Sequence, residues 1–263
     1  MQEVTTFDFG DGKGPVSAHR HKNPDGSEGG WVADDTATVD KTAYVGPDAR
    51  VYGWAQVSWM ARVYDQAQVS GQAEVSGLAE VSGLAEVFGE AQIYGKAQIY
   101  GNTRISGQAR IYDLARVSGW AWVWGDSRVF DQARVYGHAW LHGQAYVYGQ
   151  AEVYGQARVF GQARVFDQAQ VFDQAHVGGC AIAMGGTRIS RAAMVVHTGT
   201  YADIHCSQTP RIIILDQDTT AIVVEDQVIV GKQHKTLREW DQDPPHHWDK
   251  LRPIVVSMIE ATK

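Results

Sequence analysis

Aromatic, imidazole and guanidinium side chains recur at a fixed spacing in the middle of the chain. They occupy matching positions in two short segments, 120–124 (WAWVW) and 138–142 (HAWLH). The interval from the first segment to the second also separates Arg104 from Trp122, and Trp140 from Arg158. Indole rings contact flat ligands and cations, guanidinium groups pair with phosphate or carboxylate, and imidazoles transfer protons. The candidate ligand-binding residues are therefore Arg104, Trp120, Trp122, Trp124, His138, Trp140, His142 and Arg158.

A six-residue repeat explains how these separated side chains can meet. From Val45 to Val177 every sixth residue is Val, Ile or Leu, which gives 23 consecutive hexads without an insertion. Ala stands two residues before almost all of them, and Gly or Asp stands mostly two residues after. Residues two apart point to the same side of a strand, and Gly or Asp supplies the positive φ of a sharp corner. Because Gly at every sixth position would break a helix, the pattern predicts short strands.

Three such strands per turn make a triangular coil of three hexads, with Ala and Val inside. Extending the pattern to Val39 and Val195 gives 27 hexads, or nine coils, and a stack roughly 43 Å tall at the usual strand spacing. Residue n then lies beneath residue n + 18, so the candidate residues form one outward-facing surface. We predict an N-terminal cap over residues 1–38, the repeat over 39–196 and a small C-terminal β/α module over 197–263.

The repeat resembles the left-handed β-helix hexapeptide proteins, an all-β class of parallel coils. The left hand, assembly into a homotrimer, and acyl transfer from acyl-CoA (the activity of its best-known members) are implied by this resemblance. Residues 10–51, 197–211 and 228–240 look like the ends of phage- and prophage-borne hexapeptide proteins. The chain departs from the acyltransferases in one respect, since no loop leaves the coils between residues 45 and 177 to frame an acceptor and a catalytic His.

Three interpretations of the aromatic surface stay open, because a monomer rarely keeps such a patch exposed without a use. It could be buried in a homotrimer, or it could bind a small anionic, nucleotide-like ligand in clefts between subunits. In the third, His138 or His142 is the general base of an acyltransferase that uses acetyl-CoA. We favour a binding protein without a cofactor or catalytic residues. In a phage setting it would capture a host signalling nucleotide in the host cytoplasm. A virion or host-protein interaction module is a further alternative.

Charge favours a small anion over a long nucleic acid. The formal net charge is −7, and residues 40–195 carry 13 basic and 13 acidic residues. Between residues 104 and 164, however, seven arginines stand against four acidic residues, so the middle of the repeat is locally basic. No apolar segment is long enough to cross a membrane and no secretion signal is recognisable, which predicts a cytoplasmic protein.

Histidines outside the repeat centre give weaker signals. His19 and His21 could bind a metal, but two histidines without a third ligand predict no metal site. His176 and His205-Cys206 lie near the predicted start of the C-terminal module, where we expect a partly buried junction rather than a nucleophile pair.

Regular patterns predict two further structural features. A column of rings at Tyr94, Tyr112, Phe130, Tyr148 and Phe166 predicts stacking between coils that stabilises the fold. In the C-terminal module, residues 211–215, 221–225 and 228–230 predict short strands. A capping box at 236–239 predicts a helix, and residues 247–262 are compatible with another.

Overall fold

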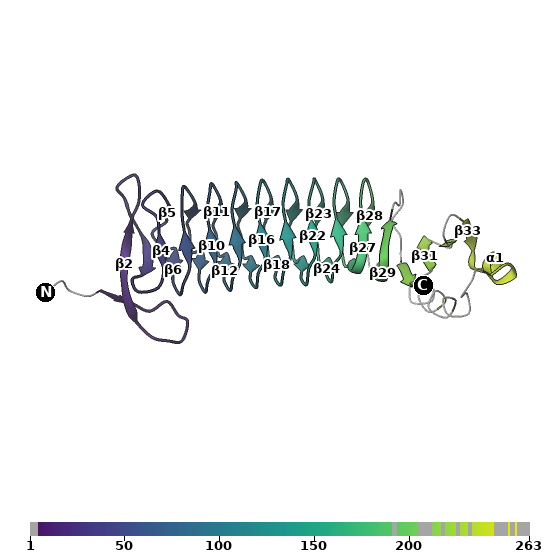
Figure 1. The fold of residues 1–263 in the computed structure, drawn as a ribbon, viewed down its shortest axis with the longest axis horizontal. Coiled ribbons are helices and arrows are strands. Elements are labelled where there is room, and N and C mark those ends of the chain that lie inside the picture. The colour runs from purple at the N-terminus through teal and green to yellow at the C-terminus, as the bar shows by residue number, and fades with distance from the viewer. Residues whose placement is uncertain are drawn as a thin grey trace.

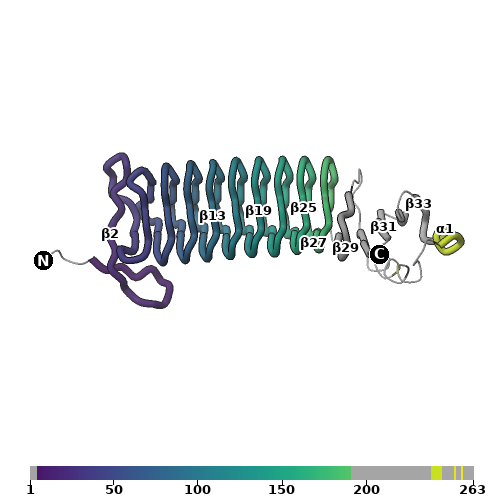
Figure 2. Tube along the Cα trace, viewed as in Figure 1, coloured from purple at the N-terminus to yellow at the C-terminus, as the bar shows by residue number. Residues whose placement is uncertain are grey.

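The chain folds into a long stack of triangular coils. The computed structural model describes residues 5–190, 194–204, 212–216, 219–224, 227–230, 233–244, 252 and 256. Its main body is a parallel β-solenoid of about nine turns that matches a left-handed β-helix, so the predicted all-β class is confirmed (Figure 1). The coils follow one another at even spacing along the long axis (Figure 2).

Each coil contributes one short strand to each of three faces. The first face contains β4 (Thr38–Val39), β7 (Gln56–Val57), β10 (Glu74–Val75), β13 (Gln92–Ile93), β16 (Arg110–Ile111), β19 (Arg128–Val129), β22 (Tyr146–Val147) and β25 (Arg164–Val165). The second contains β5 (Tyr44–Val45), β8 (Arg62–Val63), β11 (Glu80–Val81), β14 (Gln98–Ile99), β17 (Arg116–Val117), β20 (Arg134–Val135), β23 (Glu152–Val153), β26 (Gln170–Val171) and β28 (Arg188–Ile189). The third contains β6 (Arg50–Val51), β9 (Gln68–Val69), β12 (Glu86–Val87), β15 (Arg104–Ile105), β18 (Trp122–Val123), β21 (Trp140–Leu141), β24 (Arg158–Val159) and the start of β27 (His176–Ala183).

The inside of the solenoid is filled by two positions of each hexad, which are apolar except at Thr103, Ser127 and Thr187. Ala121 and Val123, for example, are fully buried, and this holds along the stack from Ala43 to Ala183. Each strand pairs in parallel with the strand one coil away. The paired residues are three hexads apart in the sequence, as Trp122 and Trp140 are. Every coil therefore buries the same small set of side chains, which stabilises the stack through hydrophobic burial.

The corners have the predicted backbone conformation. The five corner aspartates adopt φ values of 55–57°, and the corner glycines of the repeat also have positive φ. At these corners the coils approach closely: a Cβ on Gly71 would lie 2.7 Å from the backbone nitrogen of Gly89. Asp is tolerated because its carboxylate can bond the next coil, as Asp65 does in accepting a hydrogen bond from the Gly83 amide at 3.0 Å. Trp59 also occupies such a corner, with φ of 57°.

The N-terminal cap closes the first coil. Its strands β1 (Thr6–Phe7), β2 (Val16–Lys22) and β3 (Glu28–Ala33) are antiparallel, and β3 pairs in parallel with β6. The Asn23 side chain donates to the Val45 carbonyl at 3.1 Å and accepts from the Val45 amide at 2.8 Å. These are the bonds that a neighbouring strand would make, so the cap covers an open sheet edge.

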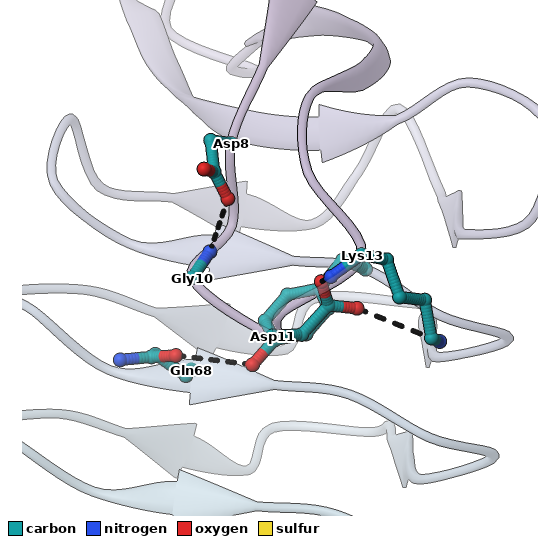
Figure 3. Close-up of polar contacts among 6 residues, drawn as sticks. Asp8, Gly10, Asp11, Lys13 and Gln68 are labelled. Carbon is teal, nitrogen blue, oxygen red and sulfur yellow. Dashed lines mark hydrogen bonds and ion pairs between the residues drawn. The ribbon is translucent and has the colours of Figure 1, made fainter.

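Two short turns shape the loop between β1 and β2. The Asp8 carboxylate accepts a hydrogen bond from the Gly10 amide at 2.8 Å, and Asp11 accepts one from the Lys13 amide at 3.1 Å (Figure 3). Such Asx turns fix a loop by replacing backbone bonds with side-chain bonds.

The C-terminal region continues the sheet and then changes to an antiparallel arrangement. β29 (Met194–Ile204) pairs in parallel with β27 and runs across residue 196, where we placed the end of the repeat. An antiparallel meander follows: β30 (Ile212–Asp216), β31 (Thr219–Val224), β32 (Gln227–Val230) and β33 (Gln233–Thr236), of which β33 was not predicted.

A short helix follows the meander. Helix α1 (Leu237–Gln242) begins directly after Thr236, as the capping box predicts. The second predicted helix, at 247–262, lies outside the described residues except for 252 and 256, and so does the His205-Cys206 pair. Within the described chain, no helix has the length and apolar character needed to span a bilayer.

Candidate functional site

The eight predicted residues lie together on the third face of the solenoid. Arg104, Trp122, Trp140 and Arg158 stand directly opposite one another on four successive strands, β15, β18, β21 and β24. The others occupy the two corners that border this face, because each lies one or two residues outside a strand. The third face thus carries the predicted aromatic surface, and the register of three hexads on which it depends is confirmed.

The centre of the site is a continuous stack of two indoles between two guanidinium groups. The rings of Trp122 and Trp140 are 5.6 Å apart, with an interplanar angle of 10°. The Arg104 guanidinium lies 5.3 Å from the Trp122 centroid, and that of Arg158 lies 4.5 Å from the Trp140 centroid. Each indole therefore has one face against the other ring and one against a cation.

This stack changes how a ligand could meet the tryptophans. We expected flat rings to stack on the indole faces, but the faces of Trp122 and Trp140 are already covered by each other and by the arginines. A ring cannot enter between them, because the hydrogen-bonded strands hold successive coils only about 4.8 Å apart. A ligand at this site would contact the edges of the rings, which carry partial positive charge.

Two further ring stacks border the face. At one corner His142 lies between Trp124, at 4.7 Å, and Phe160, at 5.4 Å, with interplanar angles of 13° and 10°. Trp124 also meets Trp140 edge to face at 5.9 Å, which joins this stack to the central one. At the other corner Trp120 lies 6.0 Å from His138. Trp120 is 56% exposed and Trp122 is 39% exposed, so the surface is open to solvent in one chain.

A groove of about 470 Å³ runs beside Trp140 and Arg158, at the C-terminal end of the stack. We name this groove the third-face groove. Its lining residues are His138, Trp140, Gln156, Arg158, Gln174 and His176. Sequence reasoning missed three of these, Gln156, Gln174 and His176. The spacing of 18 residues could have found them, since it leads from His138 to Gln156 and Gln174, and from Arg158 to His176. His176, which we expected at a junction, pairs with Arg158 across β24 and β27.

The two arginines of the stack differ in their charge environment. Arg104 makes an ion pair with Glu86 at 3.1 Å. Arg158 makes none with any residue that the structure describes, and no acidic residue lines the third-face groove. The positive charge of Arg158 is therefore not compensated by a carboxylate of the described chain, and it lies beside an open groove.

Two imidazoles near Arg158 are shifted toward the neutral form. Burial lowers the pKa of His142 below its usual value of 6.5, and the Arg158 charge lowers it further. Burial and the same guanidinium lower the pKa of His176 as well. Both rings are therefore neutral at neutral pH, and each can donate one hydrogen bond and accept one through its two nitrogens.

The arrangement of His138 and His142 does not favour a role as general base. His138 and His142 lie at opposite ends of β21, on different corners, so they cannot act on one substrate atom together. Within the described residues, neither imidazole is oriented by a carboxylate, and both faces of His142 are covered by Trp124 and Phe160. A catalytic base is normally held by such a partner.

Other sequence signals are structural in character. The predicted ring column from Tyr94 to Phe166 is stacked at 4.8–4.9 Å, with interplanar angles of at most 7°. A second column, Tyr136, Tyr154 and Phe172, was not predicted.

The two histidines of the cap point to different partners. His19 bonds Asp34, whereas His21 is buried and bonds the Ala43 carbonyl at 3.1 Å. No group of three or more His, Cys, Asp and Glu side chains in the described part of the chain is arranged to hold a metal ion.

Comparisons with known proteins return structures only. No protein-family model and no curated protein sequence matches the chain. One similar solved structure is the UDP-N-acetylglucosamine O-acyltransferase of Moraxella catarrhalis, with 16% identity, 65% of this chain and 68% of that chain covered, and a TM-score of 0.41. Another is a putative acetyltransferase of Bacillus cereus, with 14% identity, 59% of this chain and 80% of that chain covered, and a TM-score of 0.32.

Proposed function

We propose that the protein is a β-solenoid binding protein whose third-face groove captures a small, planar, anionic ligand of the nucleotide type. The observation that carries this proposal is the charge of the groove. Arg158 is its one cation, no carboxylate lines it, and Arg158 has no carboxylate partner among the described residues. An open groove of this size, with a guanidinium that forms no ion pair with a described residue, suits a phosphate or carboxylate group.

The other polar residues of the groove suit the rest of such a ligand. The amides of Gln156 and Gln174 and the imidazoles of His138 and His176 offer hydrogen-bond donors and acceptors to polar atoms of a base or sugar. The positive edge of Trp140 can meet the π face of a ligand ring in an edge-to-face contact. This contact replaces the stacking on indole faces that the sequence suggested.

Trimer formation would complete the site. The exposed rings of Trp120 and Trp122 lie on the same face as the groove, and large aromatic side chains are enriched in the cores of protein interfaces. In a homotrimer these rings would pack against a neighbouring solenoid and turn the open groove into a cleft between subunits. The terminal segments resemble those of phage-borne hexapeptide proteins. If the chain is itself phage-borne, the ligand would be a host signalling nucleotide that the protein sequesters.

Titration calorimetry with adenosine monophosphate tests the proposal. We expect wild-type protein to bind the nucleotide, and Arg158→Gln to weaken binding at least about tenfold, since a hydrogen-bonded charge pair contributes about 1.5–3 kcal/mol. Arg128→Gln is the matched control, because Arg128 also lies over an aromatic ring, Tyr146 at 5.4 Å, but on the first face.

Two results would count against this function. Equal loss of binding in Arg128→Gln and Arg158→Gln would mean that the nucleotide responds only to overall charge. Release of free thiol from acetyl-CoA that disappears in His138→Ala would instead support the acyltransferase alternative.

A further inference from the structure

A second groove lies on another face of the solenoid. It has a volume of about 540 Å³ and follows the second face between a row of corner side chains and a row of strand side chains. The corner row is Lys96, Leu114, Gln132 and Gln150, and the strand row is Gln98, Arg116, Arg134 and Glu152. We name it the second-face groove.

The arginines of the second face are neutralised unequally. Arg62, which lies on the second face but outside the groove, forms an ion pair with Glu80 at 3.8 Å. Arg134 forms one with Glu152 at 3.4 Å. Arg116 has Gln98 on one side and Arg134 on the other. Neither Arg116 nor Lys96 forms an ion pair with any residue in the described part of the chain.

The carboxylate that lines the groove is already engaged. One oxygen of Glu152 accepts from Arg134 at 3.4 Å, and the other accepts from the Tyr136 hydroxyl at 3.3 Å. With three cations and one acid, the lining carries two positive charges in excess. The remaining polar residues are glutamines, whose amide groups can donate hydrogen bonds without adding negative charge.

Two guanidinium groups on this face repel each other. Arg116 stands directly opposite Arg134 on the neighbouring strand, and like charges in this position destabilise a sheet. An anion between the two guanidinium groups would offset this repulsion, because each can form paired hydrogen bonds with phosphate oxygens. Lys96, at the corner, adds a third positive charge that suits an anion with more than one negative charge.

We propose that the second-face groove binds a polyphosphate such as pyrophosphate through Arg116, Arg134 and Lys96. This site is separate from the third-face groove and uses none of its residues. It takes its ligand by charge and oxygen geometry alone, because no aromatic side chain of the described chain lines it.

Calorimetry with inorganic pyrophosphate tests this site. We expect Arg116→Gln to weaken pyrophosphate binding at least tenfold, and Arg116→Lys to weaken it less. Arg62→Gln is the matched control on the same face, and it should change the affinity by less than twofold, because Glu80 already neutralises Arg62. Circular dichroism of each variant verifies that the solenoid is folded.

Each alternative outcome is distinct. Unchanged binding in Arg116→Gln would overturn the proposal, as would equal losses in Arg62→Gln and Arg116→Gln. Loss of pyrophosphate binding in Arg158→Gln alone would place the anion in the third-face groove. Loss in Arg116→Gln alone would support the second-face site even if adenosine monophosphate does not bind at all.

Discussion

The Arg158 guanidinium lies 4.5 Å from the centroid of the Trp140 ring and has no carboxylate partner within the described part of the chain. At the opposite end of the same stack, Arg104 is neutralised by Glu86. The two ends of the stack therefore differ in charge. The end at Arg104 is neutralised by its ion pair, whereas the end at Arg158 is cationic. The third-face groove lies at the cationic end, which is why we place an anionic ligand there.

The charge of Arg158 should be visible in the titration of its neighbours. We expect Arg158→Gln to raise the pKa of His142 and His176, because burial first and the Arg158 charge second hold both pKa values below 6.5. Imidazole signals followed by NMR across the acidic pH range measure this. Arg128→Gln, on the first face, should leave both pKa values as they are, and unchanged pKa values in Arg158→Gln would contradict the geometry.

The same shifts predict how stability depends on pH. A histidine whose pKa is lower in the folded protein than in the unfolded chain makes stability depend on pH. Its full contribution to the free energy of unfolding is present when the pH is above the pKa of the unfolded chain. This contribution is lost as the pH falls below about 6.5, since the unfolded chain takes up protons more readily. Wild-type protein should therefore unfold at lower denaturant concentration as the pH falls from 7 toward 5, and the loss should be smaller in Arg158→Gln.

The ring stack should stabilise the solenoid measurably. Trp140→Ala removes contacts with Trp122, Trp124 and Arg158, and we expect a loss of about 2–4 kcal/mol in the free energy of unfolding. Trp54→Ala provides the comparison, because Trp54 is 64% exposed and forms no ring contact within the described residues. That variant should differ from wild type by less than about 0.5 kcal/mol in urea unfolding. Equal losses in the two variants would show that the stack contributes nothing.

Two hydroxyls inside the solenoid give opposite predictions. Thr103 and Ser127 replace the inward Ala of their hexads and are fully buried. The Thr103 hydroxyl has no hydrogen-bond partner among the residues that the structure describes, whereas that of Ser127 donates to the Trp124 carbonyl at 2.8 Å. Thr103→Ala should raise the free energy of unfolding by about 1 kcal/mol, and Ser127→Ala should lower it by about 1 kcal/mol. A lower midpoint of thermal unfolding in Thr103→Ala would show that its methyl group contributes more than its hydroxyl costs.

Trp59 occupies a corner where most hexads of the repeat have Gly or Asp. Its φ of 57° is costly for a bulky residue, and its side chain is 70% exposed, so packing does not compensate. The Asp40 carboxylate accepts a hydrogen bond from the Trp59 amide at 3.0 Å and helps to hold this corner. We expect Trp59→Gly to raise the free energy of unfolding by about 1 kcal/mol. Gly71→Ala should instead lower the free energy of unfolding, because its Cβ would lie 2.7 Å from the backbone of the next coil.

The fold could be predicted because every coil repeats the same local arrangement. Ala and Val two residues apart must point inward together, and Gly or Asp must form the corner, so one hexad predicts all the others. The register of three hexads then places Trp122 beside Trp140 without any knowledge of the coordinates. The meander from β30 to β33 has no such repetition, and for this reason β33 was missed.

The details of the site depended on side-chain orientation, which spacing does not specify. The sequence placed the arginines beside the tryptophans but could not show that they cover the indole faces. Gln156 and Gln174 carried no chemical signal of their own, because glutamine is common at corner positions of this repeat. His176 was assigned to a junction by its distance from the repeat centre, although its register with Arg158 places it in the groove.

A crystal structure of the protein with adenosine monophosphate bound would test the central claim most directly. We predict the phosphate within hydrogen-bonding distance of the Arg158 guanidinium, with the base against the edge of Trp140. A phosphate bound only at Arg116 and Arg134, or a base held away from the third face, would contradict the claim that the third-face groove is the ligand site.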